Sequence, residues 1–317
     1  MVAQLPLQLA NLSLILQTAI MTQVRKSRPL DHLVLPTADL AVSQKRHDQL
    51  GFIVAPKGVH PFGTENACVF FADGTFLEPL AIGQRETAEA ASLGGNVFTA
   101  RDATYRFRKG VEGFSAIVMG SDDAVGDHEQ FEKAGISAGR ILDFGRDFVT
   151  PQSVASRMDF RLAFAADLRS PDSFFFTCQR INVPKADRSK LIGHENGTVS
   201  IMTILMSEPN PTDFQYLLQE VVNEREVESH SFGMDIKTRN ATLSVLTHAG
   251  LKAFYDLDTH GDRRGILMRG IVFGVSDIAR TKYLLTSRGI SFVEKGSKLI
   301  VKPQAGQGAA YVFEALE

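Results

Sequence analysis

Hydrophobic and polar positions repeat one order of elements along the chain. The first copy reads "DHLVLPTADLAVSQKRHDQLGFIVAPKG" from Asp31. Its apolar opening predicts a strand, Asp39 begins an amphipathic helix, Gly51 ends that helix, and "FIV" predicts the next strand. An Asp accepts hydrogen bonds from the first turn of a helix, and a Gly readily adopts the left-handed conformation just past the last turn. The pattern therefore predicts a strand, a helix and a second strand.

Three further copies follow, and the third of the four, which begins with "GTVSIM", is the weakest. Their helix start and stop signals are Asp122 and Gly135, Asn210 and Asn223, and Asp277 and Gly289. The opening strands of the four copies are expected near residues 32–36, 114–119, 199–206 and 270–275. Four matches in the same order indicate an internal repeat rather than a coincidence of spacing.

Each copy continues with strand-like runs, such as "ACVFFAD" and "TFLEPLAI" in the first and "ATLSVLTH" and "LKAFYDL" in the third. The repeat is thus a βαβββ unit, which cannot enclose a core alone. We expect an α+β fold in which four units pair into two half-open barrels. The expected domains are residues 29–184 and 194–317, preceded by an extension, residues 1–28. The polar run "VPKADRSKLIGH" separates the two barrels.

Composition narrows the class of protein. The chain is 44% hydrophobic and 22% charged with a net charge of −2. It therefore has no net positive charge that would attract nucleic acid. The apolar N-terminal run is too short to span a bilayer and lacks the marks of a secretory signal, so we expect a peripheral extension and a cytoplasmic protein. The two cysteines, Cys68 and Cys178, lie in apolar runs and are expected as buried thiols in a reducing compartment.

One acid stands out, because Glu78 lies between Leu77 and Pro79 in a segment that is otherwise apolar. A buried carboxylate is costly unless it is paired or bound to a cation. His32 lies on the first strand of the same unit, and together they have the ligand types of a metal site. The alternatives are a hydrogen-bonded core histidine and a pairing of Glu78 with a nearby arginine. Those arginines are Arg101, Arg106 and Arg108. Their alternation with aromatic residues is more typical of a solvated strand or loop than of a nucleic-acid surface.

The loop "HPFGTEN" has residues suited to a ligand-binding rim. Gly63 lets a ligand approach the backbone, and His60, Thr64 and Asn66 offer hydrogen bonds. A purely structural loop is an equal alternative. The segment "HENGTVSI" brings His194 to the start of the second half, either as a substrate contact or as a turn between domains. Cys178 follows three phenylalanines, which favours core packing over a nucleophilic role.

The four-unit plan resembles the vicinal oxygen chelate superfamily, and "DHLVL", "LGF", "GVHPFGTENA", "FLEPLAI" and "HENGTVSI" resemble the bacterial glyoxalase-like domain proteins. The resemblance implies a divalent metal (Zn, Mn, Fe or Ni) held by His32 and Glu78, with Glu78 also acting as a base. It implies substrate contacts from His60, Thr64, Asn66, His194 and Gln179. Simple alignment puts Ser115 and Gly270 at the histidine position, and Cys178 or Gln179 and Glu314 near the acid position. No pair of units then holds three ligands.

We therefore expect a glyoxalase- or dioxygenase-type enzyme, either a lyase or isomerase or a dioxygenase. Its substrate would be a small, oxygen-rich molecule chelated to a metal, and a homodimer is one expected assembly. The incomplete ligand set keeps a second hypothesis open, a non-catalytic protein that sequesters a small molecule. Neither hypothesis involves nucleic acid or a membrane.

Overall fold

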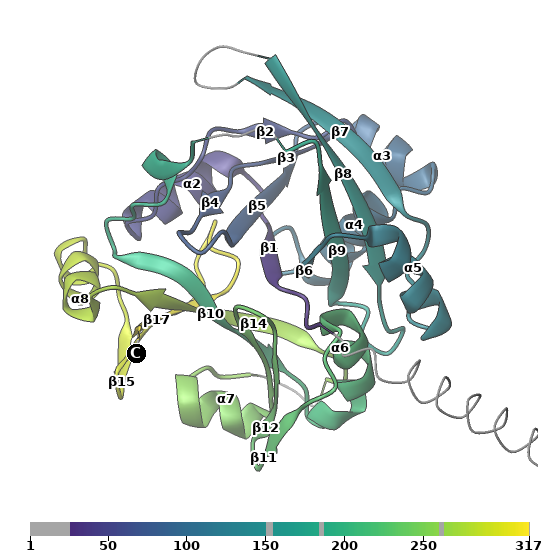
Figure 1. The fold of residues 1–317 in the computed structure, drawn as a ribbon. Helices are drawn as coiled ribbons and strands as arrows, with labels where there is room; N and C mark the ends of the chain where they lie inside the picture. Colours follow the sequence, from purple (N-terminus) through teal and green to yellow (C-terminus); the bar gives the residue numbers. More distant parts are fainter. Residues whose placement is uncertain (1–25, 150–154, 184–186, 260–262, 317) are drawn as a thin grey trace, which may run out of the picture.

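The structure is a computed structural model that describes residues 26–149, 155–183, 187–259 and 263–316 (Figure 1). The expectation of a peripheral extension over residues 1–20 lies outside the described residues. Among the described helices, none is long and apolar enough to cross a membrane.

Four βαβββ units follow one another along the chain, as the repeat predicts. In chain order the strands and helices are β1 (Leu30–Pro36), α2 (Leu40–Gln49), β2 (Gly58–Val59), β3 (Thr64–Asn66), β4 (Val69–Phe70), β5 (Phe76–Ile82), α3 (Arg85–Leu93), α4 (Val97–Lys109), β6 (Ala116–Ser121), α5 (Ala124–Lys133), β7 (Leu142–Val149), β8 (Ala155–Ala165), β9 (Phe174–Ile181), β10 (Thr198–Ser207), α6 (Gln215–Val222), β11 (Glu228–His230), β12 (Gly233–Lys237), β13 (Thr242–Leu246), α7 (His248–Tyr255), β14 (Leu267–Val275), α8 (Ile278–Ser287), β15 (Val293–Lys295), β16 (Lys298–Val301) and β17 (Ala310–Ala315). Short 3₁₀ turns, Ser189–Leu191 and Pro211–Phe214, precede β10 and α6. The four predicted opening strands are confirmed as β1, β6, β10 and β14.

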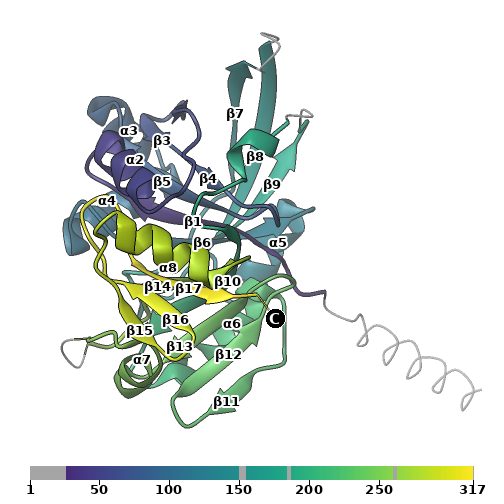
Figure 2. The same ribbon diagram turned by 90° about the vertical axis from the view of Figure 1, so that its left-hand side faces the viewer.

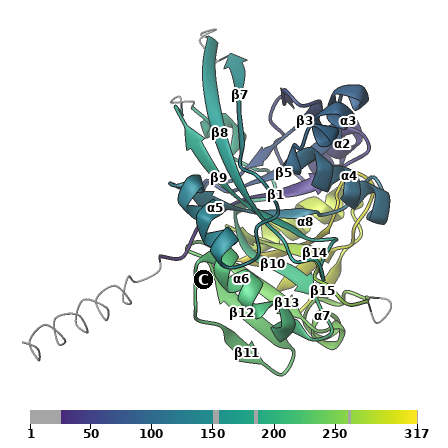
Figure 3. The ribbon, with the colours of Figure 1, turned by 90° about the vertical axis from the view of Figure 1, so that its right-hand side faces the viewer.

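The units pair into two sheets, which confirms the expected α+β fold class. The first sheet has nine strands in the order β2-β3-β5-β1-β6-β9-β8-β7, with β4 beside β5, and the second has eight in the order β11-β12-β13-β10-β14-β17-β16-β15. In each unit the first strand runs parallel to the last, and the first strands of paired units run antiparallel to each other. In Figures 2 and 3, β7 and β8 project beyond the rest of the first sheet.

The largest core lies between the two sheets. Alternation along β1 sends Leu33 and Leu35 toward this core, where Ile204 of β10 and Phe273 of β14 also lie. Helices from opposite halves meet at its edges. Gln130 Nε2 on α5 donates to Glu220 Oε2 on α6 (2.8 Å), and Arg288 Nη1 at the end of α8 donates to the backbone oxygen of Asp48 on α2 (2.8 Å). The other face of the first sheet, which carries His32, Val34, Glu78, Val118 and Phe176, is called its inner face below.

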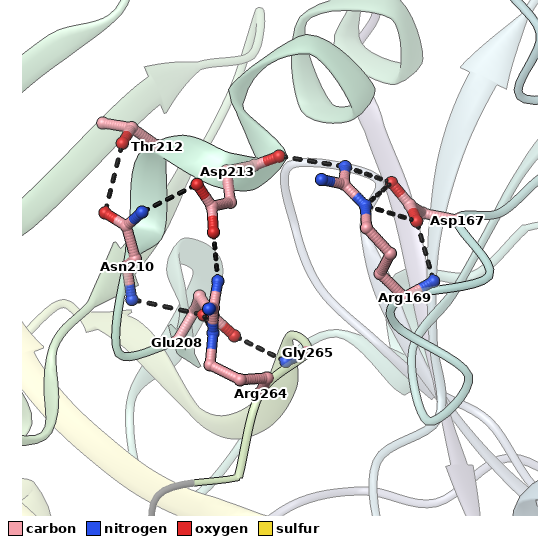
Figure 4. Close-up of polar contacts among 8 residues, drawn as sticks. All are labelled: Asp167, Arg169, Glu208, Asn210, Thr212, Asp213, Arg264 and Gly265. Carbon is pink, nitrogen blue, oxygen red and sulfur yellow. Dashed lines mark hydrogen bonds and ion pairs between the residues drawn. The ribbon is translucent and has the colours of Figure 1, made fainter.

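A polar network also joins the halves (Figure 4). Glu208, which is fully buried after β10, accepts hydrogen bonds from Arg264 Nε (2.6 Å) and the Gly265 backbone N–H (2.6 Å), so its charge is neutralised where it is buried. Arg264 also pairs with Asp213, whose backbone oxygen accepts from Arg169 Nη2 (3.1 Å). Arg169 lies between β8 and β9. The contact therefore holds a loop of the first half against the start of α6 in the second.

Several predicted elements are wrong. The "FIV" segment, residues 52–54, forms no strand. The second helix is capped by Asp123, whose side chain accepts from Gly126 N, rather than by Asp122. "LKAFYDL" lies mostly in helix α7, because the side chain of Thr247 caps that helix and Leu251 is buried on it. The basic segment with Arg101 forms helix α4, whose buried residues Phe98 and Tyr105 are seven positions apart, a helical spacing that the charged residues obscure.

Candidate functional site

An inner pocket opens on the inner face of the first sheet. Its cavity volume is about 60 Å³, and its mouth is open to solvent. His32 on β1 and Glu78 on β5 lie at its polar end, and Asn66 on β3 and His60 just before β3 lie beside them. The rest of the wall is largely aromatic. Its phenyl rings belong to Phe62, Phe70, Phe76, Phe98, Phe144, Phe160 and Phe176.

Strand register explains why His32 and Glu78 meet. Val34 pairs with Glu78 on the parallel strand β5, and His32 lies two residues before Val34, so both polar side chains share the inner face. His32 Nε2 lies 3.4 Å from Glu78 Oε2. The sequence prediction that the two side chains face one cleft is confirmed.

The same register identifies the equivalent positions in the other units. His32 lies seven residues before the helix-capping residue Asp39, and the caps Asp123, Asn210 and Asp277 place Ala116, Thr203 and Gly270 at that position. Following the strand pairs from there places Phe176, Ser244 and Val312 at the position of Glu78. This corrects the simple alignment, which pointed to Ser115, Cys178 or Gln179, and Glu314. Only the first unit therefore has an ionisable pair at these two positions.

Oppositely charged groups form a chain through His32. Arg180 Nη2 donates to Asp31 Oδ1 (2.5 Å), and the same oxygen lies 2.7 Å from His32 Nδ1. On its other side His32 Nε2 approaches Glu78 at a distance that suits an ion pair but exceeds that of a good hydrogen bond. Phe76 stacks on the imidazole at a centroid distance of 4.4 Å. The ring is held from both edges and one face, with both nitrogens next to carboxylates.

These contacts shift the protonation of the buried groups. Burial alone would lower the pKa of His32, but the hydrogen bond with Asp31 and the nearby Glu78 carboxylate outweigh it and raise the pKa. Burial would raise the pKa of Glu78, yet His32 and then His60 and Asn66 hold it down at about 2. Burial opposes ionisation of Asp31 too, but His32 and Arg180 leave its pKa lowered. The arrangement favours an imidazolium between two carboxylates.

Asn66 and His60 complete the polar end of the pocket. Asn66 Nδ2 donates to Glu78 Oε1 (2.6 Å) and lies 3.5 Å from His60 Nε2, while His60 Nδ1 lies 2.9 Å from Thr64 Oγ1. Burial lowers the pKa of His60 to about 4, so this imidazole is neutral. With Asn66 as the donor, His60 accepts at Nε2 and donates from Nδ1 to Thr64. Thr64 thus orients His60 and is fully buried.

Thr64 does not line this pocket, and neither do two further predicted substrate contacts. His194 Nδ1 accepts from the backbone of Ile53 (3.0 Å), its Nε2 lies 2.9 Å from the Phe70 backbone oxygen, and its ring packs against Phe52 and Phe71. Gln179 accepts from Ala124 N and donates to the Asp122 backbone oxygen, which ties β9 to the start of α5. Both residues join elements of the fold.

The arginines considered as partners of Glu78 are engaged elsewhere. Arg106 pairs with Asp102 (2.7 Å), Arg108 with Asp172 (2.5 Å), and Arg101 lies over the ring of Phe174. Cys68 and Cys178 are free and buried as expected, and burial raises the pKa of both thiols, which disfavours a thiolate nucleophile.

Sequence reasoning missed Asp31, Arg146, Arg180 and Arg188. Asp31 adjoins His32, and Arg180 alternates with Phe176 and Cys178 along β9, so strand periodicity could have identified it as inward-facing. Arg146 lies on β7, a strand that the sequence pattern did not predict. Arg188 follows β9 in an irregular segment whose polar sequence indicated only a linker.

The donors at the polar end form an incomplete set of metal ligands. Imidazole and carboxylate are suitable ligand types, but the amide N–H of Asn66 is directed at Glu78 Oε1, and the equivalent positions on β6 and β9 carry Ala116 and Phe176. Within the described parts of the chain, no group of three or more His, Cys, Asp or Glu side chains is arranged to hold a metal. The pair instead has the partners that a buried salt bridge requires.

Paired βαβββ units around a polar inner face define a protein of the glyoxalase/dioxygenase fold class. The Glyoxalase-like domain model matches residues 30–222, and the chain belongs to that family. The match spans both units of the first sheet and extends through α6.

Solved structures share the fold at low sequence identity. A hypothetical protein from Staphylococcus aureus aligns with a TM-score of 0.63 and 13% identity over 91% of this chain and 99% of its own. A mutant 4-hydroxymandelate synthase from Streptomyces coelicolor gives 0.55 and 12% over 92% and 94%. An Mn(II)-bound glyoxalase from Novosphingobium aromaticivorans gives 0.53 and 9% over 92% and 83%. The comparison with curated protein sequences gives no match.

Proposed function

We propose that this protein is an enzyme of the glyoxalase/dioxygenase type that acts on a small, oxygen-rich molecule in the inner pocket. The observation that carries the proposal is the buried imidazolium–carboxylate pair of His32 and Glu78 in a pocket lined largely by aromatic rings. Groups whose pKa values are shifted by burial and a specific partner gather at functional sites. Membership of the Glyoxalase-like domain family and the glyoxalase among the similar structures support the same reading.

In this proposal His32 is the catalytic residue and acts as an acid. Its raised pKa favours the protonated ring, which can donate to a substrate oxygen that gains negative charge. Glu78, with a pKa of about 2, is a poor proton acceptor near neutral pH, so its role is to keep His32 charged rather than to act as the base first expected. Asp31 orients the ring, and Asn66 orients Glu78.

Two alternatives rest on separate observations. A metal-dependent enzyme is favoured by the approach of two imidazole Nε2 atoms to one carboxylate, at 3.4 Å for His32 and 3.7 Å for His60, and one solved structure of the same fold is Mn(II)-bound. A sequestration protein is favoured by the absence of an ionisable pair at the equivalent positions of the second unit.

The cytoplasmic location of the protein stays a prediction.

The test combines metal analysis with product screening. Protein purified without chelator is analysed for bound metal and then incubated with small hydroxy- and oxo-acids, with and without EDTA, while mass spectrometry detects products. We expect conversion that survives EDTA, falls about 10²- to 10⁴-fold in His32→Gln, and is unchanged in Thr203→Val at the equivalent position of the second sheet. Stoichiometric metal with EDTA-sensitive conversion would favour the metal enzyme. Binding without any conversion would favour sequestration.

A further inference from the structure

The inner pocket carries more positive than negative charge. Three guanidinium groups line it, those of Arg146, Arg180 and Arg188, and His32 adds a fourth cation. The carboxylates available to them are Glu78 in the pocket and Asp31 beside it. Arg180 and His32 are occupied with these two acids, which leaves Arg146 and Arg188 uncompensated.

Neither Arg146 nor Arg188 forms an ion pair with a described residue. Arg146 lies over the ring of Phe160, 5.7 Å from its centroid, and its hydrogen bond to a described residue is a long contact of 3.5 Å from Nη1 to Asn66 Oδ1. Arg188 lies over Phe70 at 4.3 Å, and burial together with the charge of Arg180 lowers the pKa of its guanidinium. A guanidinium has five N–H donors. Among the described residues, most of those donors have no protein acceptor.

The wall between the arginines and the polar end suits a flat ring. Phe62 and Phe144 meet edge to face at 5.1 Å, and Phe98 meets Phe176 in the same way at 6.0 Å. Aromatic walls favour planar apolar groups, which pack against ring faces and edges. Phe160 and Phe70 lie beside the guanidinium groups of Arg146 and Arg188, and a planar guanidinium can stack on an aromatic face while its donors stay free for an anion.

Resting on the proposed function, we propose that the substrate class is a single-ring aromatic oxyanion, with its carboxylate or phosphate held between Arg146 and Arg188 and its ring against the phenylalanines. Binding of the anionic group between the two arginines would neutralise the excess positive charge. The remaining oxygen atoms of the substrate would then lie toward His32. Arg146 also lies 3.5 Å from Asn66, which donates to Glu78, so Asn66 links the anion site to the His32–Glu78 pair.

The test measures binding by calorimetry with four probes: phenylacetate, phenyl phosphate, phenylacetamide and acetate. We expect at least one aromatic anion to bind tenfold or more tightly than both the neutral amide and acetate. Charge-assisted hydrogen bonds lie at the upper end of hydrogen-bond strength, so Arg146→Gln and Arg188→Gln should each weaken that binding about tenfold or more. The two aromatic anions separate a carboxylate ligand from a phosphate.

Matched variants separate this inference from the proposed function. Arg161→Gln changes an arginine on the outer side of the same strand as Phe160, where it pairs with Asp143, and should bind the anion as the native protein does. Glu78→Gln should retain anion binding while losing conversion. The aromatic-anion class would be overturned if neither phenylacetate nor phenyl phosphate binds more tightly than phenylacetamide and acetate, or if no probe binds. Loss of anion binding in Glu78→Gln alone would also overturn it. None of these outcomes by itself removes His32 chemistry on a different substrate.

Discussion

The two sheets share their strand order and register but differ in what lies on their inner faces. In the first sheet the positions of His32 and Glu78 open into a pocket. In the second the same positions carry Thr203 and Ser244, and apolar side chains surround them, including Leu205 and Leu246. The backbone arrangement therefore does not create the site. The site is created by the side chains at these two strand positions, together with the helices that cover the inner face.

The covering helices enter at equivalent places in the chain. Helices α3 and α4 follow β5, and helix α7 follows β13 directly (Figure 3). Helix α7 packs Leu251 into the apolar cluster of the second sheet, whereas α4 adds Phe98 to the wall of the pocket. At the same point of the repeat, helix α7 fills the inner face of the second sheet, whereas helices α3 and α4 leave a pocket on the inner face of the first.

Truncation of these two covering side chains is expected to have the largest effect on stability. Leu251→Ala should lower the free energy of unfolding by about 2–5 kcal/mol and Phe98→Ala by about 3–5 kcal/mol, since both side chains are buried. Only Phe98→Ala should change the affinity for an aromatic probe, because only Phe98 lines the inner pocket. Urea unfolding and calorimetry measure the two quantities. A change in probe affinity in Leu251→Ala would contradict the division of roles between the inner faces.

Protonation offers a second, smaller contrast. Removing one partner of the buried pair, in Glu78→Gln, should lower the free energy of unfolding by about 1–3 kcal/mol near pH 5.5. Ser244→Ala, at the equivalent position, has no ionisable group and should show no pH-dependent difference from the native protein.

The pH dependence follows from the direction of each shift. The folded pKa of Glu78, about 2, lies below its ordinary value of about 4.3, so its stabilising contribution is present above that value and is lost as the pH falls toward 2. The folded pKa of His32 is raised, so its contribution is complete below its ordinary value of about 6.5 and is lost as the pH rises through the folded value. The difference in free energy of unfolding between the native protein and Glu78→Gln should therefore become smaller both below and above pH 5.5. A difference that is constant from pH 3 to pH 9 would show that His32 and Glu78 are not coupled.

The repeat made most of the fold predictable, because cap residues and strand alternation are local signals. Asp39 and Asp277 gave helix starts correctly, and the alternation around His32 and Glu78 placed both on one face. The covering helices were harder to predict, since "LKAFYDL" is apolar enough for a strand, and the helix that forms there depends on the Thr247 cap and on the burial of Leu251 against the second sheet. Arg146 and Arg188 were missed because their role depends on Phe160 and Phe70, which are distant in sequence. His194 was assigned to the site from its neighbourhood in the sequence, and its contacts instead join Ile53 to Phe70.

The smallest expected effects come from the helix caps, where the two halves are most alike. Asp39 Oδ1 accepts from Ala41 N (2.6 Å), and Asp277 Oδ1 accepts from Ala279 N (2.9 Å) and Arg280 N (3.1 Å). Each Asp→Ala substitution should therefore lower the free energy of unfolding by about 1 kcal/mol, and Asp→Asn should restore most of it. Neither should alter probe affinity, because both caps lie away from the inner pocket.

The same pair of variants tests whether residues 29–184 and 194–317 behave as separate domains. The core between the sheets and the Glu208–Arg264 network join the halves, and these contacts favour a single cooperative transition. In that case Asp39→Ala and Asp277→Ala shift one calorimetric transition by the same small amount. If the halves unfold independently, each variant shifts only one of two transitions, and the domain boundaries expected from the sequence would also be thermodynamic ones. Coincident shifts in both variants would instead mean that the second half, although its equivalent positions carry no ionisable pair, stabilises the half that contains the pocket.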